Sequence, residues 1–136
     1  MDSAPYVLDA IWTLCHIIYM PWEVVITDEC LEWYDGLSEE EQDSVDFGVS
    51  LIQRQGPTLK RPYADVIHGS SFKNMKELRI QHDGRPYRVL FIFDPQRNAV
   101  LLIGGDKTGN DRWYDEYLPK AERVYANYLE ETGQSG

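Results

Sequence analysis

The sequence predicts a single α+β domain in which helices come first and antiparallel strands follow. Residues 28–55 carry helix signals with an apolar stripe, whereas residues 64–105 alternate apolar and polar side chains with the period of a strand. Helices and strands segregated along a chain are typical of α+β folds rather than of doubly wound parallel sheets. We expect two N-terminal helices and a C-terminal helix packed on a small, mainly antiparallel sheet.

The composition is that of a globular protein with one modest core. The chain has 136 residues, of which 43% are hydrophobic and 12% aromatic. Cys15 and Cys30 lack the spacing of a zinc site or a disulfide framework, so we expect no metal, no cofactor and a reducing, cytoplasmic location. The apolar residues 10–20 are too few to span a bilayer, and no membrane contact is expected.

A boundary is expected near Met20. Residues 1–19 are predicted to be an N-terminal extension, which is either an appended helix or a segment upstream of an original start at Met20. Residues 20–132 form the predicted domain and residues 133–136 a tail.

The domain is expected to open with a strand and a short helix. The β-branched alternation of Trp22–Thr27 predicts the strand. Asp28 is the expected N-cap of a helix over Glu29–Asp35, which Gly36 ends.

A second helix follows at once. Ser38 and Glu41 have the spacing of a capping box, in which each residue satisfies the other's free backbone N–H. The apolar stripe of this helix is Val45, Val49 and Ile52. Gly56-Pro57 is expected to end it.

Four strands and a helix are predicted in the rest of the chain. The strands are expected over Ala64–Ile67, Met75–Gln81, Tyr87–Asp94 and Ala99–Gly105, the last three as a meander. The helix over Asn110–Glu131 is expected to break or restart at Pro119, because proline lacks the backbone N–H that a helix uses. Gly133 is expected to end it.

The turns of the meander predict where three cations lie. Asp83-Gly84 is a strong signal for a two-residue hairpin loop, and centring the hairpin there places Arg79 opposite Arg88. The next turn sets Arg88 opposite Gly105 and leaves Lys107 on the same face. The facing positions of this hairpin on the other side are apolar, so one face is expected to be apolar and the other charged.

Two arginines that face each other on a sheet repel, so an anion is needed to offset them. Glu77 lies on the same face and supplies part of this charge, and a bound phosphate would supply more because guanidinium groups match phosphate oxygens. The same pattern also fits the ordinary solvated face of a half-buried sheet.

The charge distribution points to the same region. The first fifty residues contain no lysine or arginine, whereas Arg54 to Lys107 hold ten of the chain's thirteen. A pI near 4.6 is unfavourable for nucleic-acid binding on average, but binding depends on local patches. The basic middle is therefore where function is expected.

Four segments of this region form a recognisable series, namely Val66-Ile67-His68-Gly69-Ser70, Lys76-Glu77-Leu78-Arg79, Tyr87-Arg88-Val89-Leu90-Phe91 and Gly105-Asp106-Lys107-Thr108. Together they resemble the RelE/ParE toxin superfamily, and most closely its HigB-like, phage Gp49-like branch. The resemblance covers about Met20 to Glu131. It implies a RelE-like fold and the toxin of a type II toxin-antitoxin module. Such a toxin is a metal-independent endoribonuclease that cleaves mRNA, on or off the ribosome, and is neutralised by a HigA-like helix-turn-helix antitoxin.

The resemblance also implies site residues. Arg79 and Arg88 match the family's strand cations, and Lys107 matches a basic residue after the last strand. Glu77 stands where the best-known members have lysine, which leaves the general base open. Glu77, His68 and Asp111 are the candidates for it, and His68 has the intrinsic pKa nearest neutrality.

Further RNA contacts are expected from the other cations and from two aromatic residues, namely Lys73, Lys76, Arg85, Trp113 and Tyr114. The plainer interpretations are that the aromatic residues belong to the core and that His68 braces its loop. Two other functions fit the same fold: a ParE-like toxin that inhibits gyrase by binding, and a former toxin retained as an interaction module. Only the ribonuclease needs Arg79, Arg88 and Lys107 for RNA cleavage.

Overall fold

The computed structural model describes residues 22–135, so the predicted extension over residues 1–19 lies outside the described residues. The elements are, in chain order, β1 Glu23–Ile26, α2 Asp28–Asp35, α3 Glu39–Gln55, a 3₁₀ turn Gly56–Thr58, β2 Ala64–Val66, β3 Lys76–His82, β4 Arg85–Phe93, β5 Asn98–Asp106 and α4 Trp113–Thr132. The predicted α+β class and the order of helices and strands are confirmed.

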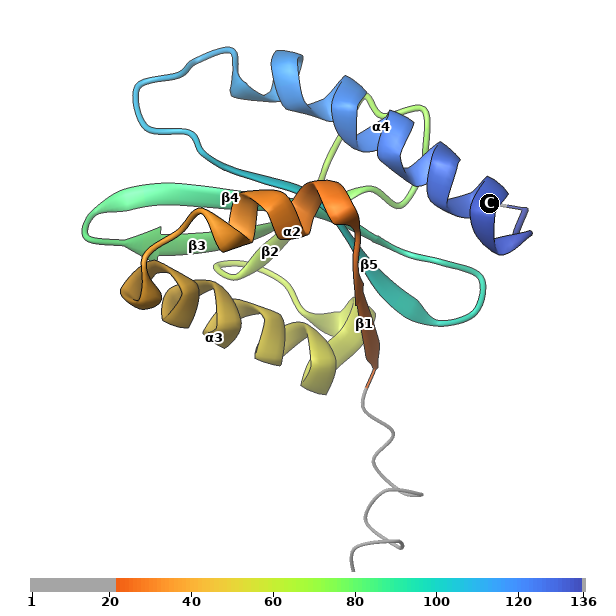
Figure 1. The fold of residues 1–136 in the computed structure, drawn as a ribbon, viewed down its shortest axis with the longest axis horizontal. Helices are drawn as coiled ribbons and strands as arrows, with labels where there is room; N and C mark the ends of the chain where they lie inside the picture. Colours follow the sequence, from red (N-terminus) through yellow and green to blue (C-terminus); the bar gives the residue numbers. More distant parts are fainter. Residues whose placement is uncertain (1–21, 136) are drawn as a thin grey trace, which may run out of the picture.

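The strands form one sheet in the order β1-β5-β4-β3-β2. β1 runs parallel to β5, and the other neighbours are antiparallel. Figure 1 shows α3 on one side of this sheet and α4 on the other. The sheet therefore has helices over both faces.

Each face has its own apolar core. Under α2 and α3, the buried residues include Cys30, Val45 and Ile52 from the helices and Leu78 and Val89 from the strands. Under α4, a second cluster joins Trp113, Ala121, Tyr125 and Leu129 of the helix to Leu90, Val100 and Leu102 of the sheet. Alternation along each strand explains why neighbouring residues belong to different cores.

The structure confirms the predicted pairing of the central strands. Arg79 pairs with Arg88, and Arg88 pairs with Gly105. Asp83 and Gly84 both have positive φ, 50° and 74°, as a type I′ hairpin turn requires. A register shift between Leu90 and Phe91, which the turn residues do not predict, changes the pairing of β4 and β5 only on the far side of Arg88.

Two local predictions are corrected. The N-cap of α2 is Thr27, whose hydroxyl accepts the backbone N–H of Cys30, and Asp28 lies in the first helical turn. α4 runs through Pro119 without a break. Buried residues on both sides of Pro119 hold the helix against the sheet, and this packing outweighs the single backbone hydrogen bond that the proline removes.

The helix ends agree with the sequence signals. Ser38 and Glu41 form the predicted capping box of α3, and Gly56 follows its last residue. Gly133 caps α4 in the left-handed conformation. In residues 22–135 no helix is long and apolar enough to cross a membrane.

Candidate functional site

Glu77 and Arg79 of β3 and Arg88 of β4 form an ionic cluster at the end of the sheet near the start of α4. Glu77 is only 3% exposed. Its Oε2 lies 3.1 Å from Nε of Arg79, and its Oε1 lies 3.4 Å from Nε of Arg88. The predicted charged face is thus present, and the buried carboxylate of Glu77 bridges both guanidinium groups.

The first turn of α4 closes this cluster. The Tyr114 hydroxyl donates a hydrogen bond to Oε1 of Glu77. Burial, and then this hydrogen bond, raises the pKa of Tyr114, so its hydroxyl keeps its proton at neutral pH. Lys107 Nζ lies 5.7 Å from the centre of the Tyr114 ring. Tyr114 therefore lies between Glu77 of the ionic cluster and Lys107.

The two arginines are not fully compensated. The Arg88 side chain is 11% exposed, and that of Arg79 is 31% exposed. Arg88 donates from Nη1 to the backbone oxygen of Tyr87 at 3.0 Å, whereas its buried Nε makes no hydrogen bond within residues 22–135. One carboxylate thus faces two guanidinium charges, an arrangement that attracts a further anion.

Gly105 creates the space for the aromatic side of the cluster. A Cβ at this position would lie 2.9 Å from Nε1 of Trp113, so only glycine fits without a shift. Trp113 is completely buried and stacks on Tyr117 with ring centroids 4.4 Å apart. Of the two aromatic residues predicted to contact RNA, Trp113 is therefore part of the core and Tyr114 reaches the cluster.

Comparison with known proteins identifies the family. Residues 32–126 match the family described as phage-derived protein Gp49-like. The candidate toxin HigB3 of Mycobacterium tuberculosis is 43% identical over 107 residues, which cover 78% of this chain and 92% of HigB3. The chain belongs to the Gp49-like family of HigB-type toxins.

Two further relatives extend the comparison. The candidate toxin HigB2 of the same organism is 36% identical over 127 residues, which cover 92% of this chain and 62% of HigB2. A free arginine-to-alanine double mutant of the E. coli toxin RelE shares the fold, with a TM-score of 0.50 and 10% identity over 82% of this chain and 98% of that one. The HigB-like, RelE-fold toxin family predicted from the sequence motifs is confirmed, and toxin relatives imply an antitoxin partner.

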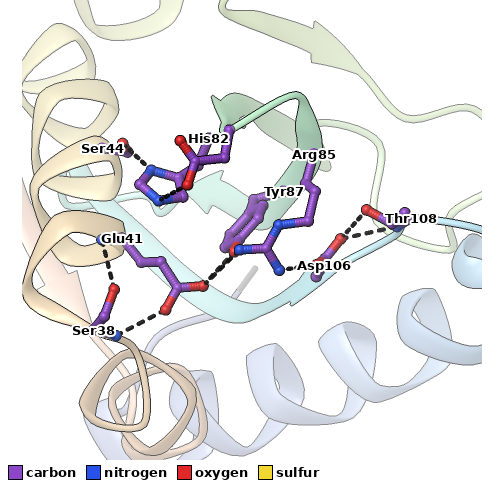
Figure 2. A network of polar contacts seen from close by, with 9 residues as sticks. Ser38, Glu41, Ser44, His82, Arg85, Tyr87, Asp106 and Thr108 are labelled. Atoms are coloured by element: carbon purple, nitrogen blue, oxygen red, sulfur yellow. Dashed lines mark hydrogen bonds and ion pairs between the residues drawn. The ribbon is translucent and has the colours of Figure 1, made fainter.

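Arg85 of this Gp49-like chain lies on the opposite face of the sheet from Arg88. Figure 2 shows it between Glu41 and Asp106. Its Nη2 lies 3.5 Å from Oε2 of Glu41, and its Nη1 lies 3.1 Å from Oδ2 of Asp106. Tyr87 donates its hydroxyl hydrogen to Glu41 in the same network. This hydrogen bond, followed by the capping bond from Ser38, lowers the pKa of Glu41 to about 2. Two carboxylates therefore engage the charge of Arg85.

Three of the other predicted residues, Lys76, Lys73 and His68, lie away from the cluster. Lys76 projects toward the face of α3, where its Nζ donates to the Pro57 oxygen at 3.3 Å and burial lowers its pKa. Lys73 and His68 are exposed in the loop between β2 and β3. Val66 pairs with Lys76, so His68 lies beyond the end of β3 that is remote from Arg79. Asp111 is exposed in the turn before α4.

The sequence therefore identified the arginine pair and its neighbours Glu77, Lys107 and Tyr114, which the structure brings together. It did not indicate that Tyr114 hydrogen-bonds Glu77, because no local pattern fixes where the first turn of a distant helix lands. The Glu41–Tyr87–Arg85 network was also missed, although the capping box of Glu41 placed its helix end correctly.

Proposed function

We propose that this protein is a metal-independent endoribonuclease toxin of a type II toxin-antitoxin module, which cleaves mRNA in the cytoplasm and so inhibits translation. The observation that carries the proposal is the pair of facing guanidinium groups, with Glu77 and the Tyr114 hydroxyl beside them. The HigB-type toxin relatives support it. The partner that we propose is a HigA-like helix-turn-helix antitoxin.

Arg79 and Arg88 bind the non-bridging oxygens of the scissile phosphate. During cleavage the ribose 2′-oxygen attacks phosphorus and the 5′-oxygen leaves, so negative charge on the phosphorane increases in the transition state. Arginine remains charged at every relevant pH and strengthens its interaction as this charge develops. Lys107 adds positive charge next to Tyr114. A divalent metal ion would be repelled by this excess of cations, whereas a phosphate is attracted.

Glu77 and Tyr114 move the protons. Glu77 accepts the proton of the 2′-hydroxyl, and Tyr114 donates its own proton to the leaving 5′-oxygen. The raised pKa of Tyr114 means that the hydroxyl carries its proton, and so can donate it, at neutral pH. The hydrogen bond between the two side chains then returns the proton from Glu77 to Tyr114, which restores both groups and leaves a 2′,3′-cyclic phosphate on the RNA. The contacts of Glu77 with both guanidinium groups, together with the remote position of His68, favour Glu77 over His68 as the base.

One observation favours the alternative, a toxin-fold protein that acts by binding alone, such as a gyrase inhibitor. Glu77 already compensates part of the charge of the arginine pair, which reduces its attraction for phosphate. The two functions make opposite predictions for purified protein and RNA.

The test is whether the purified protein cleaves RNA, both free of ribosomes and on ribosomes. The reactions on free RNA are run once with EDTA and once with magnesium. Cleavage that persists in EDTA and leaves 2′,3′-cyclic phosphate ends supports the proposal. Tyr114→Phe removes the proton donor together with its hydrogen bond to Glu77 and keeps the ring, so kcat should fall about 100-fold while KM changes little. Magnesium-dependent cleavage with 5′-phosphate ends, or no cleavage of either substrate, would refute it.

A further inference from the structure

A groove of about 650 Å³ crosses the free edge of β3 next to the arginine pair. α3 lines one side of it, and the segment before β2 lines another. The residues that matter below are Asp43, Phe47, Tyr63, Gln81, Arg79 and Arg88. The groove therefore combines apolar surface with both guanidinium-bearing residues, and the chemistry proposed above leaves its apolar part unused.

Two aromatic side chains in the groove are exposed in the part of the chain that the structure describes. Phe47 of α3 is 56% exposed, and Tyr63 is 42% exposed. Their ring centroids lie 6.4 Å apart with the planes at 71°, so each ring leaves a face open. An exposed aromatic face beside a phosphate-binding cation is the arrangement on which single-stranded nucleic acids stack their bases.

The edge of β3 also offers unpaired backbone groups at this point. Arg79 N–H donates to the Tyr63 oxygen at 2.7 Å, and β2 pairs with β3 only from Lys76 to Leu78. Alternation in an antiparallel strand directs the N–H and C=O of Gln81 to this same edge, next to the first residue of β2. No strand of residues 22–135 pairs with them there. A donor and an acceptor side by side can bind the polar edge of a base.

We propose that this groove is a nucleobase-binding subsite, which holds the base of the nucleotide adjoining the phosphate at Arg79 and Arg88. The base stacks on Phe47 or Tyr63 and hydrogen-bonds to the backbone of Gln81. Asp43 repels phosphate, so the base rather than a second phosphate occupies its side of the groove. The subsite rests on the proposed function, because it takes the phosphate to be that of RNA.

A protein strand fits this edge less well than a base. Within residues 22–135 the open stretch is short, because it lies between the Arg79–Tyr63 hydrogen bond and the turn at Asp83. Strand addition depends on several successive backbone hydrogen bonds, whereas one base needs only one or two. The two arginines further favour a ligand that carries phosphate.

The experiment measures binding of an uncleavable hexanucleotide, with deoxyribose at every position, and of its abasic analogue. Tyr63→Ala and Phe47→Ala are compared with Val66→Ala, which truncates a 43% exposed side chain of β2 outside the groove. The aromatic variants come from separate segments, and each removes an exposed side chain, so the core is unchanged. At least one of them should weaken binding of the hexanucleotide about 5- to 100-fold and leave the abasic analogue unaffected. Val66→Ala should bind like the wild type.

Equal binding by wild type and both aromatic variants would overturn the subsite, as would equal affinity of the wild type for the abasic analogue. The subsite would also be overturned, in favour of a protein-docking groove, by the following pair of results. A partner protein binds the wild type but neither aromatic variant, and the hexanucleotide binds the wild type and both variants equally. Failure of the subsite is distinct from failure of the proposed function. Base-dependent binding through Tyr63 or Phe47 in a protein that does not cleave RNA supports the subsite and refutes the nuclease. Cleavage and hexanucleotide binding that are unchanged in both variants refute the subsite and leave the nuclease standing.

Discussion

Replacing Glu77 with glutamine tests whether the arginine pair needs an anion. Glu77 is 3% exposed and contacts both guanidinium groups, of which Arg88 is 11% and Arg79 31% exposed. Breaking a buried ion pair costs about 3–5 kcal/mol, whereas water compensates a more exposed partner. The amide keeps one acceptor oxygen, which places the expected loss at the lower end, about 3 kcal/mol in the free energy of unfolding.

The assay is urea unfolding at neutral pH in a buffer free of phosphate. Asp65→Asn is the matched control, because this half-exposed carboxylate pairs with Arg61, which is 68% exposed, and should cost less than about 1 kcal/mol. Added inorganic phosphate should restore part of the stability of Glu77→Gln, since a ligand of the folded state stabilises it. A loss no larger than that of Asp65→Asn, with no effect of phosphate, would refute the reasoning.

Two further predictions concern the face under α2 and α3. Gly104→Ala should cost about 1–3 kcal/mol in urea unfolding because the new Cβ would lie 2.3 Å from Trp33, whereas Gly36→Ala, which makes no close contact, should cost far less. Tyr87→Phe should flatten the loss of stability in acid. The folded pKa of Glu41 is lowered from 4.5 to about 2, so its stabilisation is present above about pH 4.5 and is lost as the pH falls through about 2. An unchanged pH dependence of the urea midpoint in Tyr87→Phe would contradict this.

The sequence predicted the core of the candidate site because that core depends on a local turn. Asp83-Gly84 fixes the hairpin, and the hairpin fixes Arg79 opposite Arg88. The burial of Glu77 could not be predicted in the same way, since Tyr114, which covers it, comes from a helix far along the chain. Long-range packing, rather than strand periodicity, decides that Glu77 on this charged face is buried.

The predictions that the structure corrects were also wrong because of long-range packing. Pro119 signals a helix break by local rules, but the contacts of α4 with the sheet override it. Asp28 and Thr27 are both good capping residues, and the choice of Thr27 follows from its hydroxyl, which also donates to the Leu101 oxygen of β5 at 2.8 Å. The groove beside β3 has no sequence signal, because it arises where the pairing of β3 with the short strand β2 stops, at the first residue of β2.

The most direct test of the central claim, that the facing arginines form the phosphate site of a ribonuclease, is the cleavage rate of Arg88→Ala. The measurement uses purified protein and RNA, free and on ribosomes, with the free-RNA reaction in EDTA. Arg123→Ala, at an exposed position of α4, serves as the control. We expect Arg88→Ala to lose at least about 100-fold in kcat/KM while its circular dichroism spectrum remains that of a folded protein, and Arg123→Ala to cleave like the wild type. Wild-type cleavage by a folded Arg88→Ala would contradict the assignment.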